Sequence, residues 1–313
     1  MAYSRWVHNT SDNMEKIIQN ISDHENWYKP NTDEFTGGDM NYNIEFIQQR
    51  ENIQLGDKNI EYSIIKYEFE KHRPGESKNP ERNIRVKLVK NYIVIFSNDD
   101  EIQYLINRNG ADAKSILRKL NNHVPRDRNT ITDKKFDFSQ DIFNWLIYVV
   151  LKNNNPIVDT LEVKKITGFK GTVDQKEQRL AEIVGSGSEI MNALSTLAFL
   201  FDNDGMSYIK PVINYNANHM SIEIDIRLNG TLDINSEEYM GDFKDEPEDI
   251  RKAKILLLLN ILVLPDLIAE FNSEVDNENW NLDTQVTMIT EIGEIIQGKV
   301  EEKIQSLVED EEE

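Results

Sequence analysis

The segment 142–151 most constrains the fold, because apolar side chains occupy almost its whole circumference. Ser139 precedes this segment and is a typical N-cap for a helix. A helix that is apolar all round is stable only when other elements surround it, so we expect this helix at the centre of a domain. The apolar run Ile255–Leu264 predicts a second core helix, which Pro265 should break or kink.

The run Ile255–Leu264 also bears on membrane association. It has ten residues and is interrupted by Asn260, whereas a helix that crosses a bilayer needs roughly 20 apolar residues. The first residues of the chain carry one arginine with no apolar run behind it, unlike a secretory signal. We therefore expect a cytoplasmic protein that has no membrane partner.

The first half of the chain combines helices with alternating strand patterns. Helical spacing of four apolar residues predicts a helix over 12–26 with one buried stripe: Met14, Ile17, Ile18 and Ile21. Alternate residues are apolar over 60–64 and again over 65–69, but the second series is one step out of phase. One inserted residue exchanges the two faces of a strand, so this slip predicts a β-bulge near Ile64-Ile65. Further expected elements are strands over 84–88 and 92–96, a tight turn at Lys90-Asn91 and a short helix over 113–120.

The second half has the pattern of strands covered by helices. Strands are expected near 161–166, 181–184, 206–215, 219–228 and 232–235. At Asn229-Gly230, a three-residue loop that pairs Ile226 with Ile234 keeps the apolar residues of both strands on one face. A last amphipathic helix begins after Asp283, with an apolar stripe of Ile289, Ile292, Ile296, Val300, Ile304 and Leu307.

These patterns predict an α+β fold of mostly antiparallel sheets packed with buried and amphipathic helices. We expect two units. The N-terminal α+β unit covers 1–135, with antiparallel strands and a basic middle segment. The C-terminal α+β unit covers 136–313, with helix-covered strands and acidic C-terminal helices.

The net charge of −21 is distributed unevenly along the chain. Residues 1–50 carry −4, residues 51–200 carry +2, and residues 201–313 carry −19. Within the middle block, the segment 71–135 has a local net charge of +7. The total net charge argues against a nucleic-acid partner, but the basic middle segment weakens this argument.

The basic segment supplies the candidate nucleic-acid contacts. These are Arg85 and Lys87 on an expected strand, Lys114, Arg118 and Lys119 on the short helix, and Arg126 and Arg128 in the connector that follows. If they share one surface, they form a strip that can follow a phosphate backbone. Two other readings are a solvated face balanced by nearby acids, and a surface that meets the acidic C-terminal region of the same or another subunit.

A glycine-serine loop is the candidate anion-binding site. Gly185, Ser186, Gly187 and Ser188 stand between an expected strand and an expected helix, where exposed backbone N–H groups can hold a phosphate or carboxylate. The other reading is a capping box, in which Ser186 caps the helix and Glu189 reaches back to it. No Walker lysine and no G-x-G-x-x-G pattern accompanies the loop.

The pair Glu162 and Lys164, together with the glycine-serine loop, gives an alternative, catalytic hypothesis: a metal-dependent nuclease or another phosphate-handling hydrolase. Magnesium-dependent nucleases place an acid and a lysine on one face of a strand, where the acid holds Mg²⁺ and the lysine orients water. They also need a second acid from a neighbouring strand, and the sequence does not identify one. The other reading is a solvated strand face.

Other chemistry-bearing residues point to no site. Glu223 and Asp225 share one face of an expected strand. They form either a metal-binding or glycosidase-like pair, or part of an outer face whose charges are neutralised by cross-strand pairing. The five histidines lie in polar stretches and are expected at the surface. Since the chain has no cysteine, it has no thiol nucleophile and no thiolate zinc site. We therefore expect no metal and no cofactor, except Mg²⁺ under the nuclease hypothesis.

We conclude from the sequence that the chain is a soluble binding or assembly protein, more in keeping with a non-enzyme than an enzyme. It is expected to act by oligomerisation through its C-terminal helices and by charge-complementary contacts with a protein partner, with nucleic acid as a second candidate partner. The abundance of isoleucine and scarcity of alanine, 37 against 9, suggest a low-GC bacterium or its phage. Phage–host conflict, such as antiviral defence, is then a natural setting.

Overall fold

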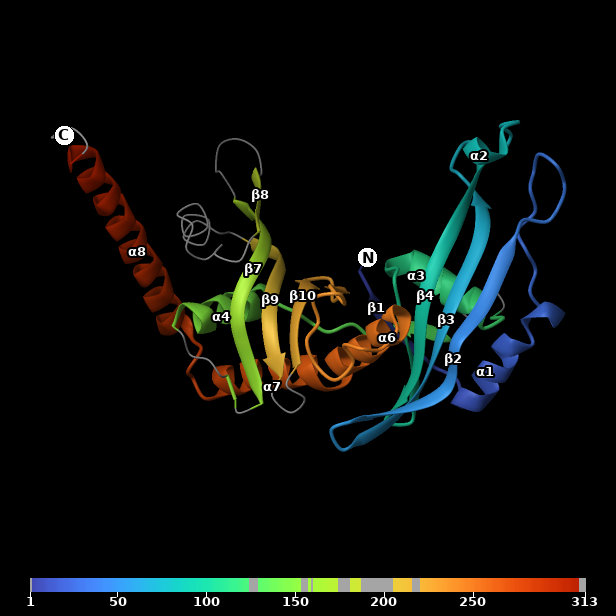
Figure 1. Ribbon diagram of the computed structural model, residues 1–313, viewed down its shortest axis with the longest axis horizontal. Coiled ribbons are helices and arrows are strands. Elements are labelled where there is room, and N and C mark those ends of the chain that lie inside the picture. The colour runs from blue at the N-terminus through green and yellow to red at the C-terminus, as the bar shows by residue number, and fades with distance from the viewer. Residues whose placement is uncertain are drawn as a thin grey trace. The chain divides into compact units, whose positions relative to one another are not determined.

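The structure, a computed structural model, describes residues 2–123, 129–152, 157–158, 160–173, 181–186, 205–215 and 220–309. It has the α+β architecture expected from the sequence, with two antiparallel sheets and helices packed on them (Figure 1). The chain divides into two compact units, which we call unit 1 (Met1–Phe136 and Asp245–Leu258) and unit 2 (Asp137–Lys244 and Leu259–Glu313). The sequence-based division after 135 lies beside the first boundary, but the segment 245–258 belongs to unit 1. That each unit folds alone stays a prediction.

Unit 1 is built on a six-stranded antiparallel sheet in the order β2-β3-β4-β5-β1-β6. Its strands are β1 (Ser4–His8), β2 (Tyr42–Leu55), β3 (Lys58–His72), β4 (Val86–Asn98), β5 (Glu101–Ile106) and β6 (Ile131–Asp133). Its helices are α1 (Met14–Ser22), a 3₁₀ turn (His24–Asn26), α2 (Arg82–Arg85), α3 (Gly110–Leu120) and α6 (Glu248–Leu258). The sequence patterns did not predict β1, β5 or β6.

Helix α1 confirms the stripe expected near the N-terminus. All four apolar residues of the stripe, Met14, Ile17, Ile18 and Ile21, are buried. The helix is shorter than predicted, because Asn13 caps it through a hydrogen bond from the backbone N–H of Lys16, and the next turn after Ser22 is 3₁₀. The helix predicted over 12–26 thus begins at Met14 and ends at Ser22.

Strand β3 is buried on both faces, which explains its out-of-phase pattern. Ile64 and Ile65 point to opposite faces, yet both are fully covered (0% exposed). On one face, Ile65, Tyr67 and Phe69 pack into a core with apolar residues of α1 and α3. The two apolar series in β3 therefore mark the two covered faces.

A bulge lies beside Ile64-Ile65 as predicted, but the extra residue belongs to the neighbouring strand β2 and not to β3. β3 pairs regularly with β4 from Tyr62 to His72, including Ile64 and Ile65. β2 instead shifts register between Phe46 and Gln48 and between Gln48 and Glu51. The extra residues bend β2 while β3 stays continuous.

Helix α6 covers the other face of the unit 1 sheet. Lys66 and Tyr92 are paired across β3 and β4 and point away from the α1–α3 core. Lys66 Nζ lies 2.6 Å from an Asp249 carboxylate oxygen, and the Tyr92 hydroxyl donates a hydrogen bond to the Asp249 carbonyl. Although α6 lies far along the sequence, it completes the packing of the N-terminal sheet (Figure 1).

The predicted turn at Lys90-Asn91 is wrong, because β4 runs through it. Asn91 is buried, and its side-chain amide donates to the Tyr67 carbonyl at 2.9 Å. This hydrogen bond satisfies the amide nitrogen of Asn91 inside the sheet, while its buried Oδ1 has no hydrogen-bond partner among the described residues. The strand expected over 84–88 begins only at Val86, since the chain before it forms the short helix α2.

Unit 2 is built on a five-stranded antiparallel sheet in the order β11-β10-β9-β7-β8. Its strands are β7 (Leu161–Val173), β8 (Ala181–Ser186), β9 (Gly205–Tyr215), β10 (Met220–Arg227) and β11 (Leu232–Ile234). Its helices are α4 (Gln140–Leu151), a π-helical turn (Leu259–Val263), α7 (Leu264–Asp276) and α8 (Leu282–Glu309).

Helix α4 is the central helix that the sequence predicts. Ser139 caps it, accepting a hydrogen bond from the backbone N–H of Ile142. Six of its residues are buried: Ile142, Phe143, Trp145, Leu146, Ile147 and Val149. It packs against β7 and β9 on one side, and Trp145 stacks near Phe271 of α7 on another.

Pro265 disturbs the long helix as predicted, but the disturbance lies before the proline. Proline lacks an N–H donor and its ring clashes with the carbonyl four residues earlier, here that of Ile261. The π-helical turn Leu259–Val263 contains this residue and widens the helix there. The chain then continues as α7, so the helix is redirected without a loop.

The hairpin between β10 and β11 corrects the predicted register. Ile226 pairs with Leu232, two residues from the predicted partner. Asn229 Oδ1 accepts hydrogen bonds from the backbone N–H and hydroxyl of Thr231, and the Arg227 N–H donates to the Thr231 carbonyl. The loop has three residues, 228–230, one position earlier than predicted, and it keeps the predicted faces because a register shift of two residues preserves the alternation.

In the part of the chain that the structure describes, one helical stretch is long and apolar enough to cross a membrane. It is Glu248–Asp276, and 56% of its most apolar window is buried inside the protein. A largely buried core helix has the same length and composition.

Candidate functional sites

Arg85 does not lie on the predicted strand face. It ends helix α2 and is buried, with 3% of its surface exposed. Its Nη2 and Nε donate to the carboxylate of Asp33 at 2.7 and 3.1 Å, and its Nη1 donates to the Pro80 carbonyl at 2.8 Å. A guanidinium with these partners is unavailable to a nucleic acid, so this part of the predicted strip is wrong.

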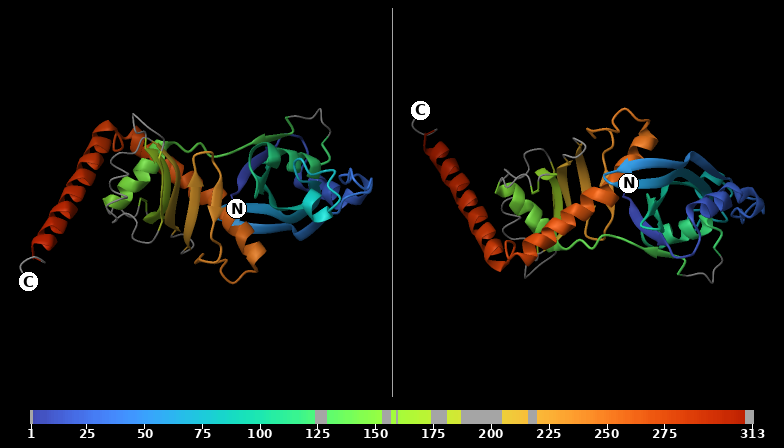
Figure 2. Two further views of the ribbon diagram at one scale, coloured as in Figure 1. Left: turned by 90° about the horizontal axis from the view of Figure 1, so that it is seen from above. Right: turned by 90° about the horizontal axis from the view of Figure 1, so that it is seen from below.

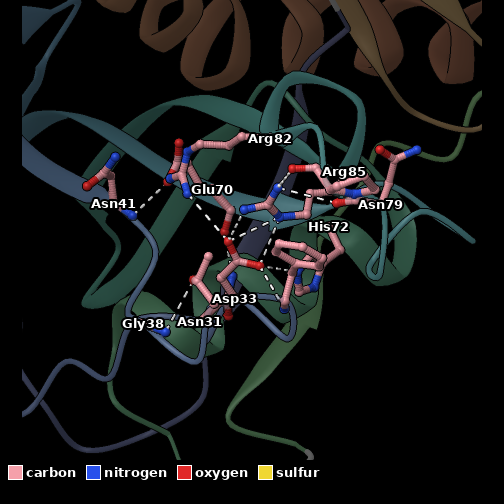
Figure 3. Close-up of polar contacts among 12 residues, drawn as sticks. Asn31, Asp33, Gly38, Asn41, Glu70, His72, Asn79, Arg82 and Arg85 are labelled. Carbon is pink, nitrogen blue, oxygen red and sulfur yellow. Dashed lines mark hydrogen bonds and ion pairs between the residues drawn. The ribbon is translucent and has the colours of Figure 1, made fainter.

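Asp33 is the centre of a cluster that no sequence pattern singles out. The cluster contains Asp33, Glu70, His72, Arg82 and Arg85 (Figure 3). Arg82 Nη2 donates to Glu70 at 2.6 Å, and its Nη1 lies 3.5 Å from Asp33. His72 Nε2 lies 3.5 Å from the other Asp33 oxygen.

The Asp33 cluster holds two loops to the sheet. Asp33 has 1% of its surface exposed, and the Arg85 guanidinium holds the pKa of that carboxyl well below its usual range despite burial. Asp33 belongs to the loop before β2, and the carbonyls bound by Arg85 belong to the loop before α2. All three nitrogens of the Arg85 guanidinium donate within the protein, so the contact between Arg85 and Asp33 has a structural role.

The remaining residues of the predicted strip lie on two elements. Lys87 is half-buried on β4, opposite Lys71 of β3. Lys114, Arg118 and Lys119 lie on α3, as predicted, and all three are half-buried. Arg126 and Arg128 lie outside the described residues. That the described members of the strip, Lys87 and the three α3 residues, share one surface stays a prediction.

Lys119 instead lines a cavity beside the Asp33 cluster. The cavity has a volume of about 470 Å³, and its wall includes Asn31, Phe69, Lys71, His72, Ser115 and Lys119. This is within the size range of small-molecule pockets. Of these residues the sequence singled out Lys119 alone, because the others come from loops and strands whose proximity depends on the fold.

The predicted glycine-serine loop is in part a strand. Gly185 and Ser186 belong to β8 and pair with Phe169 and Gly168 of β7. Gly187, Ser188 and the helix expected to follow lie outside the described residues. The backbone N–H and C=O groups of Gly185 and Ser186 therefore belong to the pairing between β8 and β7.

Glu162 and Lys164 lie on β7 as predicted, in an irregular part of the strand. Glu162 Oε2 accepts a hydrogen bond from Asn214 at 2.7 Å. Lys164 is exposed, at a register shift where β7 has one residue more than β9. No set of three histidine, aspartate or glutamate residues suited to a metal ion occurs among the described residues.

Glu223 and Asp225 lie on the polar face of the unit 2 sheet, where cross-strand pairs form. Lys210 Nζ lies 2.5 Å from Glu223, and Thr167 donates to the other Glu223 oxygen at 2.6 Å. Although burial opposes it, these hydrogen bonds lower the pKa of Glu223. Asp225 stands directly opposite Asp233, and burial together with Asp233 raises the pKa of Asp225.

We expect Asp225→Asn to stabilise unit 2 at neutral pH by about 0.5–1 kcal/mol, because it removes one of two facing carboxylates. The raised pKa means that the ionised form is unfavourable in the folded state, so the gain should disappear as acid protonates Asp225. Thermal unfolding at pH 7 and pH 3 measures both effects. Glu223→Gln is the matched control and should destabilise the protein, since it weakens the pair with Lys210.

The exposed face of helix α8 is the second candidate interaction site. Eight residues alternate at spacings of four and three along the helix and form what we call the α8 seam: Leu282, Val286, Ile289, Gly293, Ile296, Val300, Lys303 and Leu307. Leu282, Val286, Val300 and Leu307 are 73%, 56%, 43% and 53% exposed. A repeat of 3.5 residues is the pattern of a coiled-coil contact.

The stripe predicted from the sequence is divided between two roles. Ile292 is buried and closes the core, whereas Val300, Ile304 and Leu307 are exposed. The predicted stripe runs at spacings of three, four, four, four and three, and four of its six residues belong to the α8 seam: Ile289, Ile296, Val300 and Leu307. The stripe leaves the seam at Ile292 and Ile304 because successive steps of four drift around the helix.

Contacts to α4 fix the first part of α8. Gln285 donates to Asp141 at 3.0 Å, and Glu291 forms an ion pair with Lys152. In both views of Figure 2, α8 extends away from the sheet of unit 2 beyond these contacts. Its C-terminal half therefore presents apolar residues to solvent.

No protein-family model matches the chain, and no curated protein matches it either.

Proposed function

We propose that the protein is a cytoplasmic assembly protein whose chains associate through the α8 seam, so that a second copy of α8 covers the exposed residues. The observation that carries the proposal is the 3.5-residue repeat along the helix, in which Leu282, Val286, Val300 and Leu307 are exposed apolar residues and Ile289 and Ile296 are half-buried. Two helices with this repeat bury it against one another, since each seam residue fits between residues of the facing helix.

The charges on α8 support pairing with an identical helix. On each side of the α8 seam, four residues lie directly beside the seam residues around the helix. Of these eight flanking residues two are charged, Asp283 and Lys299. The acidic residues of the helix lie farther round its surface: Glu291, Glu294, Glu301, Glu302 and Glu309. Two copies can therefore meet without bringing like charges together at the contact. Lys303 is the one charged residue within the seam, and such a residue helps to set the register.

The strongly acidic second half of the chain adds a means of partner selection. Residues 201–313 carry a net charge of −19, and pairing through the seam would double this charge in one assembly. A field of one sign speeds association with basic partners and disfavours acidic ones. We infer a basic protein partner for the assembled form.

The oligomeric state of the full chain tests the proposal. Light scattering coupled to size exclusion should give twice the mass of one chain for the wild type. Val300→Glu should give the mass of one chain, because it places a carboxylate at the centre of an apolar contact. Gln305→Glu adds the same charge on the opposite side of α8 and should leave the dimer intact.

A wild-type mass of one chain across the micromolar range would refute assembly through α8. So would an equal loss of mass in both variants, because that would reflect net charge instead of the seam. Circular dichroism at 222 nm should show that both variants keep the wild-type helix content.

A further inference from the structure

The cavity beside the Asp33 cluster is lined by two lysines that form no ion pair among the described residues. Lys71 of β3 and Lys119 of α3 contribute to its wall together with His72. Lys71 also stands directly opposite Lys87 in the neighbouring strand. Within the described part of the chain, none of these three lysines forms an ion pair. Two facing lysines repel one another, so an anion bound nearby would relieve an unfavourable contact.

Lys119 is held in place by contacts that leave donors available. Asn31 donates to the Glu70 carbonyl at 2.6 Å, and its Oδ1 accepts from Lys119 Nζ at 3.2 Å. The ammonium also lies 4.8 Å from the ring centre of Tyr28 and 5.4 Å from that of Phe69. An ammonium has three N–H donors, and the hydrogen bond to Asn31 uses one. The side chain is therefore pre-positioned, with its charge uncompensated by any carboxylate.

Burial lowers the pKa of Lys119, which agrees with this geometry. Removing an ammonium from water without a counter-ion is unfavourable, and contacts with aromatic rings compensate it only in part. A bound anion would supply the missing charge. The charge of Lys119 is therefore better compensated when an anion occupies the cavity than when the cavity is empty.

We propose that this cavity binds the phosphate of a phosphate monoester of about the size of a mononucleotide, with Lys119 and Lys71 as the charged contacts. A phosphate dianion matches two lysines better than a carboxylate does. Ser115 and Thr32 add hydroxyl donors to the wall, and Phe69 and Ile116 add apolar surface for the organic part. Asp112 is the one carboxylate in the wall, and it is exposed.

Calorimetric titration of the full chain with AMP tests this site. AMP should bind, inorganic phosphate should bind more weakly because it lacks the organic part, and adenosine should not bind. Lys119→Met keeps the length and packing of the side chain but removes its charge, so it should weaken AMP binding by about 10- to 100-fold. Lys119→Arg should restore part of this loss, and Asp112→Asn should strengthen binding by removing a repelling charge.

Lys114→Ala is the matched control, since it removes one positive charge from the same helix outside the cavity. It should leave AMP affinity within about twofold of wild type. No heat with AMP or phosphate would refute the proposal, and so would equal losses in Lys114→Ala and Lys119→Met. Binding of a single-stranded oligonucleotide without binding of AMP would also refute it, because the contacts would then belong to a nucleic-acid surface. A thermal unfolding curve shows that each variant is folded.

Discussion

Replacing Arg85 with methionine is expected to lower the midpoint of thermal unfolding by roughly 10 °C. The substitution leaves the Asp33 carboxylate buried without its main donor. Breaking a buried ion pair by removing one partner is far more costly than losing a surface pair, because the remaining charge stays out of water. Differential scanning calorimetry at pH 7 measures the shift.

Two variants separate this effect from a general loss of charge. Arg82→Met removes the neighbouring guanidinium, which is 47% exposed and bound to Glu70. Exposed pairs contribute little, so the midpoint should fall by about 2 °C or less. The double variant Asp33→Asn with Arg85→Met should recover much of the loss, because no charge is left buried. A double variant less stable than Arg85→Met alone would contradict this account.

The effect of Arg85→Met should also depend on pH. The pKa of Asp33 is lowered in the folded state, so this carboxyl stabilises the fold above its ordinary pKa of about 4. That contribution is lost as the pH falls toward the lower, folded-state pKa. The difference between wild type and Arg85→Met should therefore be largest at neutral pH and shrink on acidification.

The Asp33 cluster shows why the sequence did not reveal this site. Asp33 stands in a polar, glycine-containing stretch, and Arg85 lies 52 positions away in a segment that alternates like a strand. Neither residue departs from an ordinary surface pattern. The pair exists because β3 and β4 bring the two loops together, and no local pattern encodes that proximity.

The elements that the sequence did predict share a local signal. α4 has an N-cap and is apolar all round, and β10 alternates from Met220 to Arg227 without interruption. β1 and β5 lack such a signal, because polar residues are buried in them. Arg5 of β1 donates to Gln103 of β5 at 2.8 Å, and both are buried. A pattern of apolar and polar residues misses strands whose polar groups are satisfied by each other.

His8 illustrates the same difficulty and leads to the second large effect. The sequence places it in a polar stretch, but it is buried in β1 with 6% of its surface exposed. Its Nδ1 lies 2.6 Å from the Tyr104 hydroxyl, which itself donates to Asn121. Tyr104 has a single proton to donate, so the neutral His8 ring must carry its proton on Nδ1. Among the described residues, nothing hydrogen-bonds to His8 Nε2.

Acid should therefore destabilise unit 1 through His8. Burial, and after it the neighbouring His123, lower the pKa of His8 to about 4 from 6.5. Because the folded state resists protonation, the stability contribution is complete above pH 6.5 and is lost as the pH falls to about 4. The difference in pKa corresponds to about 3 kcal/mol. The free energy of unfolding, measured in urea between pH 7 and pH 4, should fall by this amount.

His8→Asn tests the origin of the loss. The asparagine amide can donate to Tyr104 as Nδ1 does, but it does not titrate, so the slope between pH 6.5 and pH 4 should flatten even if the loss of ring packing lowers stability at every pH. His24→Asn removes one histidine from the same unit and is the matched control. Equal slopes for His8→Asn and the wild type would show that another group carries the acid sensitivity. A flattened slope in His8→Asn alone would assign it to the buried ring, where a proton on Nε2 has no acceptor among the described residues.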